Sequence, residues 1–250
     1  MAARRKAIRL ALAAALALVS LSGCTGAEPR EPVPLGLMGT IPIYWGEAPE
    51  LGDLLDGGAT RHWARAQLER DYALRPVDYL DDASLAGLDF LLLAQPRALS
   101  AEENVALDAW VRSGGRLLLF ADPLMTGRSA FAIGDRRRPQ DVILLSPILG
   151  HWGLELQFVD DQPTGPRVVR DGGLALPVDL PGRFAPGAGE GGCVLSADAV
   201  LARCALGKGR ATILADAALL DLHDPDPLAG PALARLEQIA FGESGEIAGR

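Results

Sequence analysis

Three polar side chains stand directly after apolar stretches of the sequence. Gln95 follows LDFLLLA, Asp122 follows RLLLFA and Asp216 follows ATILA. Such runs are typical of strands buried on both faces, and in open α/β sheets ligands bind beyond the carboxyl ends of the strands. If the two Asp-ending strands are neighbours, their carboxylates face one crevice and could hold a cation, bind sugar hydroxyls or share a proton. In the alternative interpretation, each Asp caps a turn or the helix that follows.

A second acidic stretch, residues 221–227 (DLHDPDP), combines carboxylates with His223. It lacks the glycine turn of calcium-binding loops, and its prolines favour an exposed rigid turn. His62 and His151 each precede a Trp, which favours packing or surface positions over a role as a base. We therefore predict no metal site and no cofactor.

The sequence also lacks a nucleophile motif, because neither G-x-S-x-G nor G-x-C-x-G is present. No catalytic residue is predicted.

Residues 194–203 have the pattern of a hairpin with its turn near Asp198-Ala199. A two-residue turn there places Cys193 opposite Cys204, at a distance that a disulfide can span. The alternative is a pair of buried free thiols.

The first 23 residues have the pattern of an export signal. Four positive charges (Arg4, Arg5, Lys6 and Arg9) precede the uncharged run Leu10 to Leu21, which is too short for a membrane span. The run ends in LSGC, which resembles the bacterial lipoprotein box. We expect cleavage before Cys24, lipidation of Cys24 and anchoring in the cell envelope with the domain facing the periplasm. Thr25 in place of Asp after the lipidated Cys favours the outer over the inner membrane.

Alternating strands and helices follow a short tether, residues 24–34. We expect strands at 35–44, 74–80, 88–94, 116–121 and 211–215, and helices from Thr60 to about Arg70 and over 231–241. Ser100 and Glu103 form a capping box at the start of a further helix that Gly114-Gly115 ends. Residues 181–192 have the composition of a loop. The sum predicts one α/β domain, residues 35–250, built as a three-layer sandwich around a mostly parallel sheet.

The overall composition fits an acidic globular domain. The formal net charge is −8, and removing the four positive charges of residues 1–23 makes it −12. Nearly half of the residues are hydrophobic, at 49%, which excludes a disordered chain. An acidic surface also argues against nucleic acid as a partner.

The stretch from LDFLLLAQPRALSAEEN to GGRLLLFADPLM resembles the core of the class I glutamine-amidotransferase-like fold. It is similar above all to the non-enzymatic branch found in gliding-motility-type ABC-transporter auxiliary proteins. Residues 141–156 and the GKGRATILADAALL segment at 207–220 add to the resemblance, which covers roughly residues 77–160 and 205–222. The resemblance implies an amidotransferase-like (flavodoxin-like) architecture. The enzymes carry a nucleophilic Cys where this chain has Phe120-Ala121-Asp122, which argues against amidotransferase chemistry.

The resemblance implies a binding or scaffolding domain that serves an ABC transport system or an envelope assembly. We expect a lipid-anchored, non-catalytic periplasmic domain with a protein partner in the envelope and a membrane contact through Cys24. Gln95, Asp122 and Asp216 are its candidate ligand-binding residues. The alternative is an envelope hydrolase in which Asp122 and Asp216 act as acid and base or as metal ligands.

Overall fold

The computed structural model describes residues 32–48, 52, 60–190 and 192–242. From Val33 onward, the described residues belong to one compact unit. Cys24 and the predicted export signal lie outside the described residues. Within the described part of the chain, no helix is long and apolar enough to cross a membrane.

Eleven strands and six helical segments make up the described part of this unit. The strands are β1 (Val33–Gly39), β2 (Tyr72–Pro76), β3 (Phe90–Ala94), β4 (Arg116–Phe120), β5 (Leu154–Gln157), β6 (Arg167–Asp171), β7 (Leu174–Val178), β8 (Arg183–Pro186), β9 (Gly192–Ser196), β10 (Leu201–Leu206) and β11 (Gly209–Leu214). The helices are α3 (Trp63–Leu68), α4 (Asp82–Leu85), α5 (Ala101–Ser113), α6 (Ser146–His151), the 3₁₀ turn η1 (Ala218–Leu220) and α7 (Ala229–Phe241).

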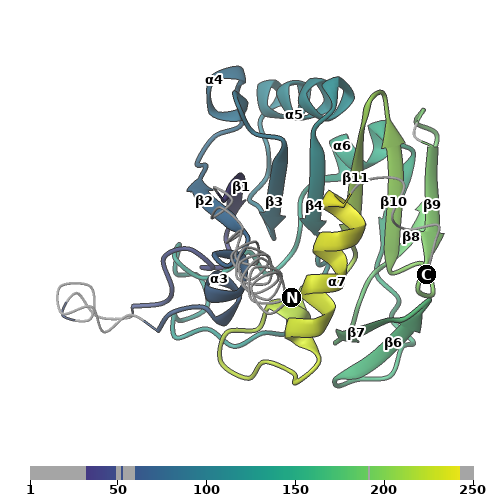
Figure 1. Ribbon diagram of the computed structural model, residues 1–250. Coiled ribbons are helices and arrows are strands. Elements are labelled where there is room, and N and C mark those ends of the chain that lie inside the picture. The colour runs from purple at the N-terminus through teal and green to yellow at the C-terminus, as the bar shows by residue number, and fades with distance from the viewer. Residues whose placement is uncertain (1–31, 49–51, 53–59, 191, 243–250) are drawn as a thin grey trace, which may run out of the picture. The chain divides into compact units, whose positions relative to one another are not determined.

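A seven-stranded sheet in the order β2-β1-β3-β4-β11-β10-β9 forms the centre of the unit (Figure 1). The first five strands in this order, β2, β1, β3, β4 and β11, pair in parallel. Strands β10 and β9 continue the sheet with antiparallel pairing. The predicted mostly parallel sheet is therefore confirmed. Strand β3, helix α5 and strand β4 form the predicted βαβ unit, and β3 and β4 are parallel neighbours.

Both faces of the central strands are buried. Leu91 and Leu117 lie side by side in register, and neither has exposed surface. Their neighbours along the strands, Leu92 and Leu118, point to the opposite face and are equally buried. Helix α7 covers one face, where Phe241 packs on Phe90 with ring centroids 5.0 Å apart. Because both faces are buried, the sequences of these strands are continuous apolar runs.

Local sequence signals place helix α5 correctly. The Ser100 hydroxyl accepts a hydrogen bond from the Glu103 N–H, and the Glu103 carboxylate accepts one from the Ser100 N–H, which confirms the capping box. Gly114 follows the helix with φ 135°, a conformation open to glycine. The predicted C-terminal helix is also present, with Leu233 and Leu236 fully buried.

Two predicted boundaries near the N-terminus are wrong. The first strand begins at Val33 and ends at Gly39, and the chain then turns, with the Gly46 N–H donating to the Pro42 carbonyl at 2.8 Å. The helix expected from Thr60 begins at Trp63 instead. Thr60 is held in a backbone bridge to Glu47, and His62 caps the helix by accepting a hydrogen bond from the Ala64 N–H at 3.1 Å.

The loop predicted over residues 181–192 is also wrong. Residues Arg183–Pro186 form β8, which pairs antiparallel with β5, and Gly192 begins β9. A second small sheet, which the sequence did not suggest, pairs β6 with β7. Strands β6, β7 and β8 are only four or five residues long, and β7 and β8 each contain a proline, so their local composition gives little sign of a strand.

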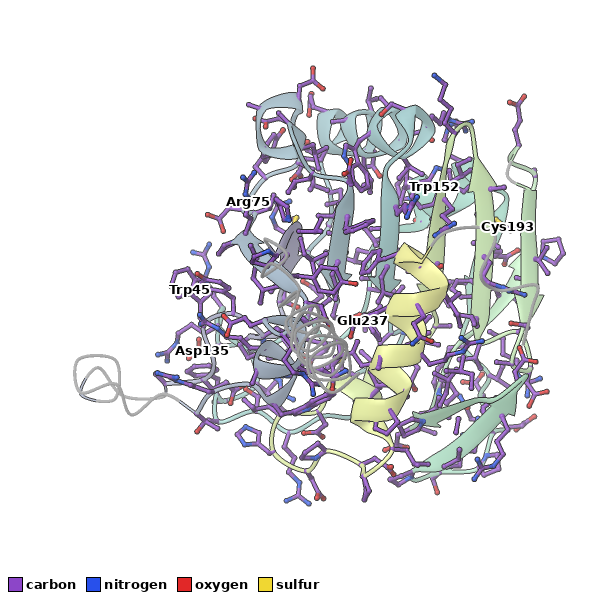
Figure 2. All side chains as sticks on the ribbon, viewed as in Figure 1. Trp45, Arg75, Asp135, Trp152, Cys193 and Glu237 are labelled. Carbon is purple, nitrogen blue, oxygen red and sulfur yellow. A yellow bond between two sulfur atoms is a disulfide. The ribbon has the colours of Figure 1, made fainter. Side chains whose placement is uncertain are left out.

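The predicted hairpin has the expected register. Strands β9 and β10 pair so that Cys193 lies opposite Cys204, although the connection spans residues 197–200 rather than two residues. The structure joins the two side chains in a disulfide (Figure 2). The bond ties the edge strand of the main sheet to its neighbour.

Candidate functional site

The fold brings the three predicted strand ends together. Strands β3, β4 and β11 are consecutive in the sheet, and Ala94, Phe120 and Leu214 are register partners at their last positions. Gln95, Asp122 and Asp216 follow these positions, and none of them has exposed surface. Strands β4 and β11, which precede Asp122 and Asp216, are therefore neighbours, as a shared crevice for the two carboxylates requires.

Backbone N–H groups occupy both oxygens of Asp122. Its Oδ1 accepts from the Leu124 N–H at 2.8 Å, and its Oδ2 accepts from the Ala217 N–H at 3.0 Å. The first contact shapes the turn after β4, and the second crosses to the turn after β11. Burial raises the pKa of Asp122 to about 6 although these hydrogen bonds favour its ionised form.

Asp216 has a matching set of contacts. Its Oδ1 accepts from the Ala218 N–H at 2.8 Å, and its Oδ2 accepts from the Asp179 N–H at 3.0 Å. Burial and the nearby Asp122 carboxylate raise the pKa of Asp216 well above its ordinary value. The two carboxylates therefore interact electrostatically, as expected for like charges in a buried setting.

Gln95 uses its side-chain amide in the same way. Its Oε1 accepts from the Asp122 N–H at 2.8 Å, and its Nε2 donates to the carbonyls of Asp122 at 2.9 Å and Gln140 at 3.0 Å. The backbone at Gln95 has φ 49°, so the chain turns sharply at the end of β3. The amide joins this turn to the loop after β4.

These contacts determine what the strand-end cluster (Gln95, Asp122 and Asp216) can do. Two carboxylates with raised pKa values can in principle exchange a proton. Here all four carboxylate oxygens already accept backbone hydrogen bonds, and the side chains are sealed from solvent. The contacts match the capping interpretation: the cluster holds the connecting loops on the end of the sheet.

A cavity of about 440 Å³ lies beside this cluster. Asp179, whose N–H binds Asp216, and Ala218, whose N–H also binds Asp216, both line it. Asp221, Asp224 and Asp226 from the predicted acidic stretch contribute further carboxylates, and Arg128 contributes a cation. Among the residues that the structure describes, no three His, Cys, Asp or Glu side chains are grouped as metal ligands.

The histidines have structural contacts. His62 is buried, accepts from the Ala64 N–H and lies 2.9 Å from the Leu220 carbonyl, and burial lowers its pKa to about 4. His223 lies 2.9 Å from Glu47, a buried carboxylate that also accepts from the Ser129 hydroxyl and the Ala130 N–H. The sequence analysis missed Glu47, because its partners are far away along the chain.

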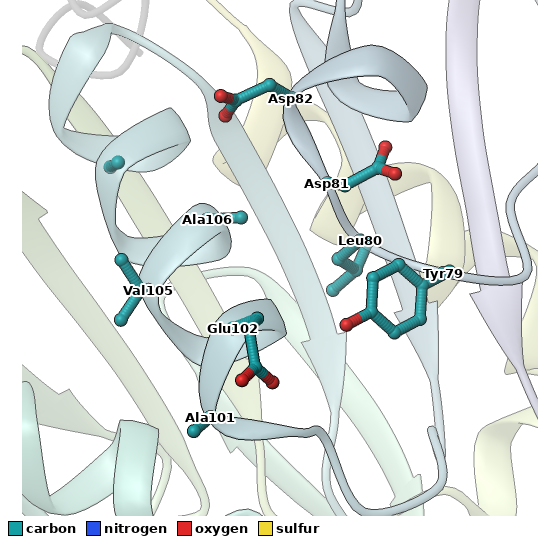
Figure 3. Close-up of a pocket in the computed structure, with 9 residues that line it drawn as sticks. Tyr79, Leu80, Asp81, Asp82, Ala101, Glu102, Val105 and Ala106 are labelled. Atoms are coloured by element: carbon teal, nitrogen blue, oxygen red, sulfur yellow. The ribbon is translucent and has the colours of Figure 1, made fainter.

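A surface groove between α4 and α5 is the second feature that the sequence analysis missed (Figure 3). Its volume is about 610 Å³. The lining residues of this α4–α5 groove are Tyr79, Leu80, Asp81, Asp82, Ala101, Glu102, Val105, Ala106 and Ala109. The one sequence signal is Val105, an apolar residue on the polar side of an amphipathic helix.

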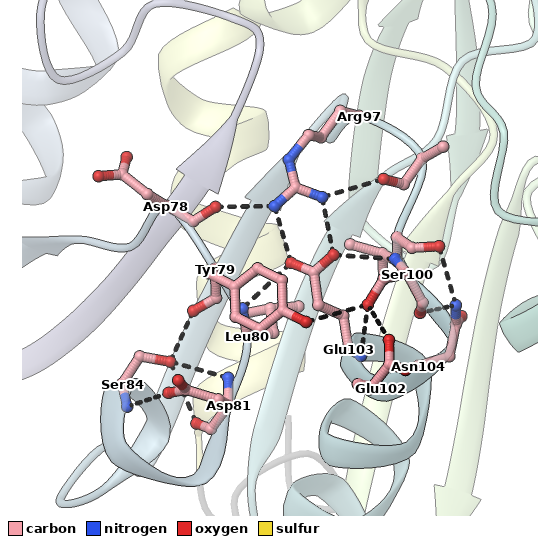
Figure 4. A network of polar contacts seen from close by, with 12 residues as sticks. Asp78, Tyr79, Leu80, Asp81, Ser84, Arg97, Ser100, Glu102, Glu103 and Asn104 are labelled. Atoms are coloured by element: carbon pink, nitrogen blue, oxygen red, sulfur yellow. Dashed lines mark hydrogen bonds and ion pairs between the residues drawn. The ribbon is translucent and has the colours of Figure 1, made fainter.

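An ion pair between the partly exposed Arg97 and the buried Glu103 supports one wall of this groove (Figure 4). Arg97 donates to both oxygens of Glu103, at 2.7 and 2.8 Å, and Glu103 has no exposed surface. Glu103 also accepts from the N–H groups of Leu80 and Ser100. The pair thus joins the loop before α4 to the first turn of α5.

Comparisons with solved structures give low similarity. An exo-β-1,4-mannosidase from Opitutaceae bacterium strain TAV5 is 13% identical, with a TM-score of 0.47 over 95% of this chain and 38% of that enzyme. A β-galactosidase of Rahnella sp. R3 is 12% identical, with a TM-score of 0.45 over 84% of this chain and 31% of that enzyme. The chain spans less than two fifths of the length of these enzymes.

No curated protein matches the chain. A family model does match residues 52–173, and it describes an ABC-type uncharacterized transport system. The match includes β3, α5 and β4, with Gln95, Asp122 and the α4–α5 groove. It supports the transport-auxiliary side of the resemblance seen in the sequence, so this part of the chain is similar to an auxiliary component of an ABC-type transport system.

Proposed function

We propose that the protein is a lipid-anchored, periplasm-facing accessory domain of an ABC-type transport system that acts by binding a protein partner. The observation that carries this proposal is the family match over residues 52–173. The match covers the βαβ unit and the residues at its strand ends, which are the parts that resemble the non-enzymatic amidotransferase-like branch.

The contacts of the strand-end cluster support a binding role over catalysis. A general acid or base must reach the proton that it transfers, and Asp122 and Asp216 have no exposed surface. Their oxygens are occupied by backbone N–H groups from the loops that they hold. The pair therefore favours a rigid scaffold.

The anchor is proposed from the sequence. LSGC at residues 21–24 supports lipidation of Cys24, and the charged and apolar segments before it stand in the order of an export signal. Acyl chains on Cys24 would hold the domain at a membrane surface. The Pro- and Glu-rich residues that follow would then act as a short extended tether.

Co-purification from the native bacterium tests the proposal. The full chain with a C-terminal tag is crosslinked in living cells, purified from membranes and analysed by mass spectrometry. We expect a permease or ATPase subunit of an ABC system to be enriched over a control lipoprotein with the same tag. Crosslinked complexes without any ABC subunit would contradict the proposed function.

A Cys24→Ser variant tests the anchor separately. We expect this variant to leave the membrane fraction and to lack the acylated N-terminal peptide in mass spectra. A Thr25→Ser variant is the matched control, because it changes the neighbouring residue but leaves Cys24 and the Cys193–Cys204 disulfide intact. Acylation that persists in the Cys24→Ser variant would contradict the anchor.

A further inference from the structure

The α4–α5 groove combines apolar surface with open access. Val105 is 70% exposed, although valine is among the residue types most often buried, and the Tyr79 ring beside the groove is 43% exposed. Small side chains of α5, namely Ala101, Ala106 and Ala109, line the groove beside them. A partner can therefore bring an apolar side chain close to the α5 backbone.

The rim of the groove is acidic. Asp81, Asp82 and Glu102 line it, and none of its described lining residues is Lys or Arg. Hydrogen bonds from Ser84 lower the pKa of Asp81, and hydrogen bonds from its own N–H and the Ser100 hydroxyl lower the pKa of Glu102. Arg97, whose guanidinium lies 6.0 Å from the centroid of the Tyr79 ring, is paired with Glu103. The groove therefore presents negative charge around an apolar surface.

Both walls of the groove are fixed in position. Asp81 and Ser84 form a capping box at the start of α4, as Ser100 and Glu103 do for α5. The Tyr79 hydroxyl lies 3.1 Å from the Ser100 hydroxyl, which joins the two walls directly (Figure 4). A surface that is already ordered loses little conformational entropy when a partner binds.

We propose that this groove binds a basic amphipathic segment of a partner protein. One apolar side chain of that segment packs on Val105 and Tyr79, and flanking Lys or Arg side chains pair with Asp82 and Glu102. The negative charge of the rim favours a basic protein segment as the partner, because the rim repels anionic lipid surfaces and nucleic acids. The inference rests on the proposed function only in that it takes the partner to be a protein.

Site-specific photo-crosslinking tests the proposal in cells. A photoreactive amino acid replaces Val105 in the full chain, and Ile133, which is 87% exposed and lies outside the groove, is the control position. We expect an adduct from position 105 whose crosslinked peptide, sequenced by mass spectrometry, has an apolar residue flanked by Lys or Arg. The absence of an adduct, or an adduct with an acidic or neutral segment, would overturn the inference.

A pair of charge-matched variants tests the role of the rim. D82N/E102Q removes two negative charges from the groove, and D160N/D161N removes two from exposed positions elsewhere. Binding of the crosslinked segment, made as a synthetic peptide, is measured by fluorescence anisotropy with the full chain. We expect the groove variant to weaken binding about tenfold and the control to change it little. Equal effects of the two variants would overturn the inference.

The outcomes separate this inference from the proposed function. A basic amphipathic segment from a protein outside any ABC system would support the groove and contradict the transport role. ABC subunits that co-purify but crosslink only at other positions would support the transport role and contradict the groove.

Discussion

Carboxylates gather in two regions of this protein, and their surroundings give them opposite properties. In the strand-end cluster, burial raises the pKa values of Asp122 and Asp216. In the α4–α5 groove, exposed Asp81 and Glu102 accept hydrogen bonds that lower theirs. The first pair is buried and its oxygens accept backbone hydrogen bonds, so a ligand has no access to it. The second pair presents negative charge to the solvent.

The comparison shows that the position of a residue in a fold does not establish a site by itself. The carboxyl ends of parallel strands are the usual place for ligands, yet here backbone N–H groups occupy the polar atoms there. No general rule about α/β folds predicts a binding site at the α4–α5 groove. Its open apolar surface and its unneutralised rim are the features that a partner could use.

The largest effect is expected at the buried carboxylate. Asp122→Ala leaves the N–H groups of Leu124 and Ala217 without their acceptor, and each unsatisfied buried group costs about 1–3 kcal/mol. We expect the free energy of unfolding to fall by about 3–4 kcal/mol, measured by urea denaturation. Asp160→Ala, at an exposed position, is the control. A loss below about 1 kcal/mol would show that the cluster does not hold the loops.

A smaller loss is expected at the support of the groove. Glu103→Ala removes the acceptor for the N–H groups of Leu80 and Ser100, and we expect a destabilisation of about 2–3 kcal/mol. Arg97 is partly exposed and can turn to solvent. Glu102→Ala, one residue earlier and exposed, should cost far less in the same denaturation experiment. Equal losses would mean that the contacts of the buried Glu103 carboxylate do not stabilise the fold more than those of the exposed Glu102.

The raised pKa of Asp122, about 6 against an ordinary 3.8, predicts a pH dependence. Between about pH 4 and 6 the folded state binds more protons than the unfolded state, so the free energy of unfolding falls as the pH rises through this window. We expect this contribution to be on the order of 2 kcal/mol. Asp122→Asn should remove this contribution and also reduce that of Asp216, because the Asp122 charge helps to raise the Asp216 pKa; urea midpoints of the two proteins are compared at pH 4.5 and 7. Parallel curves would contradict the raised pKa.

The smallest effect on stability is expected at the open surface of the groove. Val105→Lys should change the free energy of unfolding by less than about 0.5 kcal/mol, because its side chain is largely exposed. Leu107→Ala, two residues further along the same helix and fully buried, should cost about 3 kcal/mol. Thermal unfolding of both variants measures this contrast. A large loss in Val105→Lys would show that Val105 is part of the core.

Local sequence signals predicted several parts of the structure well. The Ser100–Glu103 capping box and the glycines after Ser113 define α5, because both signals act within one or two helical turns. The apolar runs of β3 and β4 mark buried neighbours. The hairpin turn set the register that places Cys193 opposite Cys204.

Other features depend on segments far apart in the chain. The strand β8 and the bridge at Thr60 form through pairing with distant backbone, so the local composition was misleading. Glu47 gains its partners Ser129 and His223 from two remote loops. The α4–α5 groove depends on a four-residue helix packed beside a longer one, which no periodic pattern reveals.

The sequence by itself determined the α/β class, the helix that links β3 to β4 and the three polar residues at the strand ends, because these follow from local periodicity and capping. Only the tertiary structure decided that β4 lies beside β11, so that Asp122 and Asp216 meet. It also decided that backbone N–H groups occupy these carboxylates while those of the groove stay exposed. Burial and hydrogen-bond partners are properties of the whole fold, and they determine which carboxylates remain open to a partner.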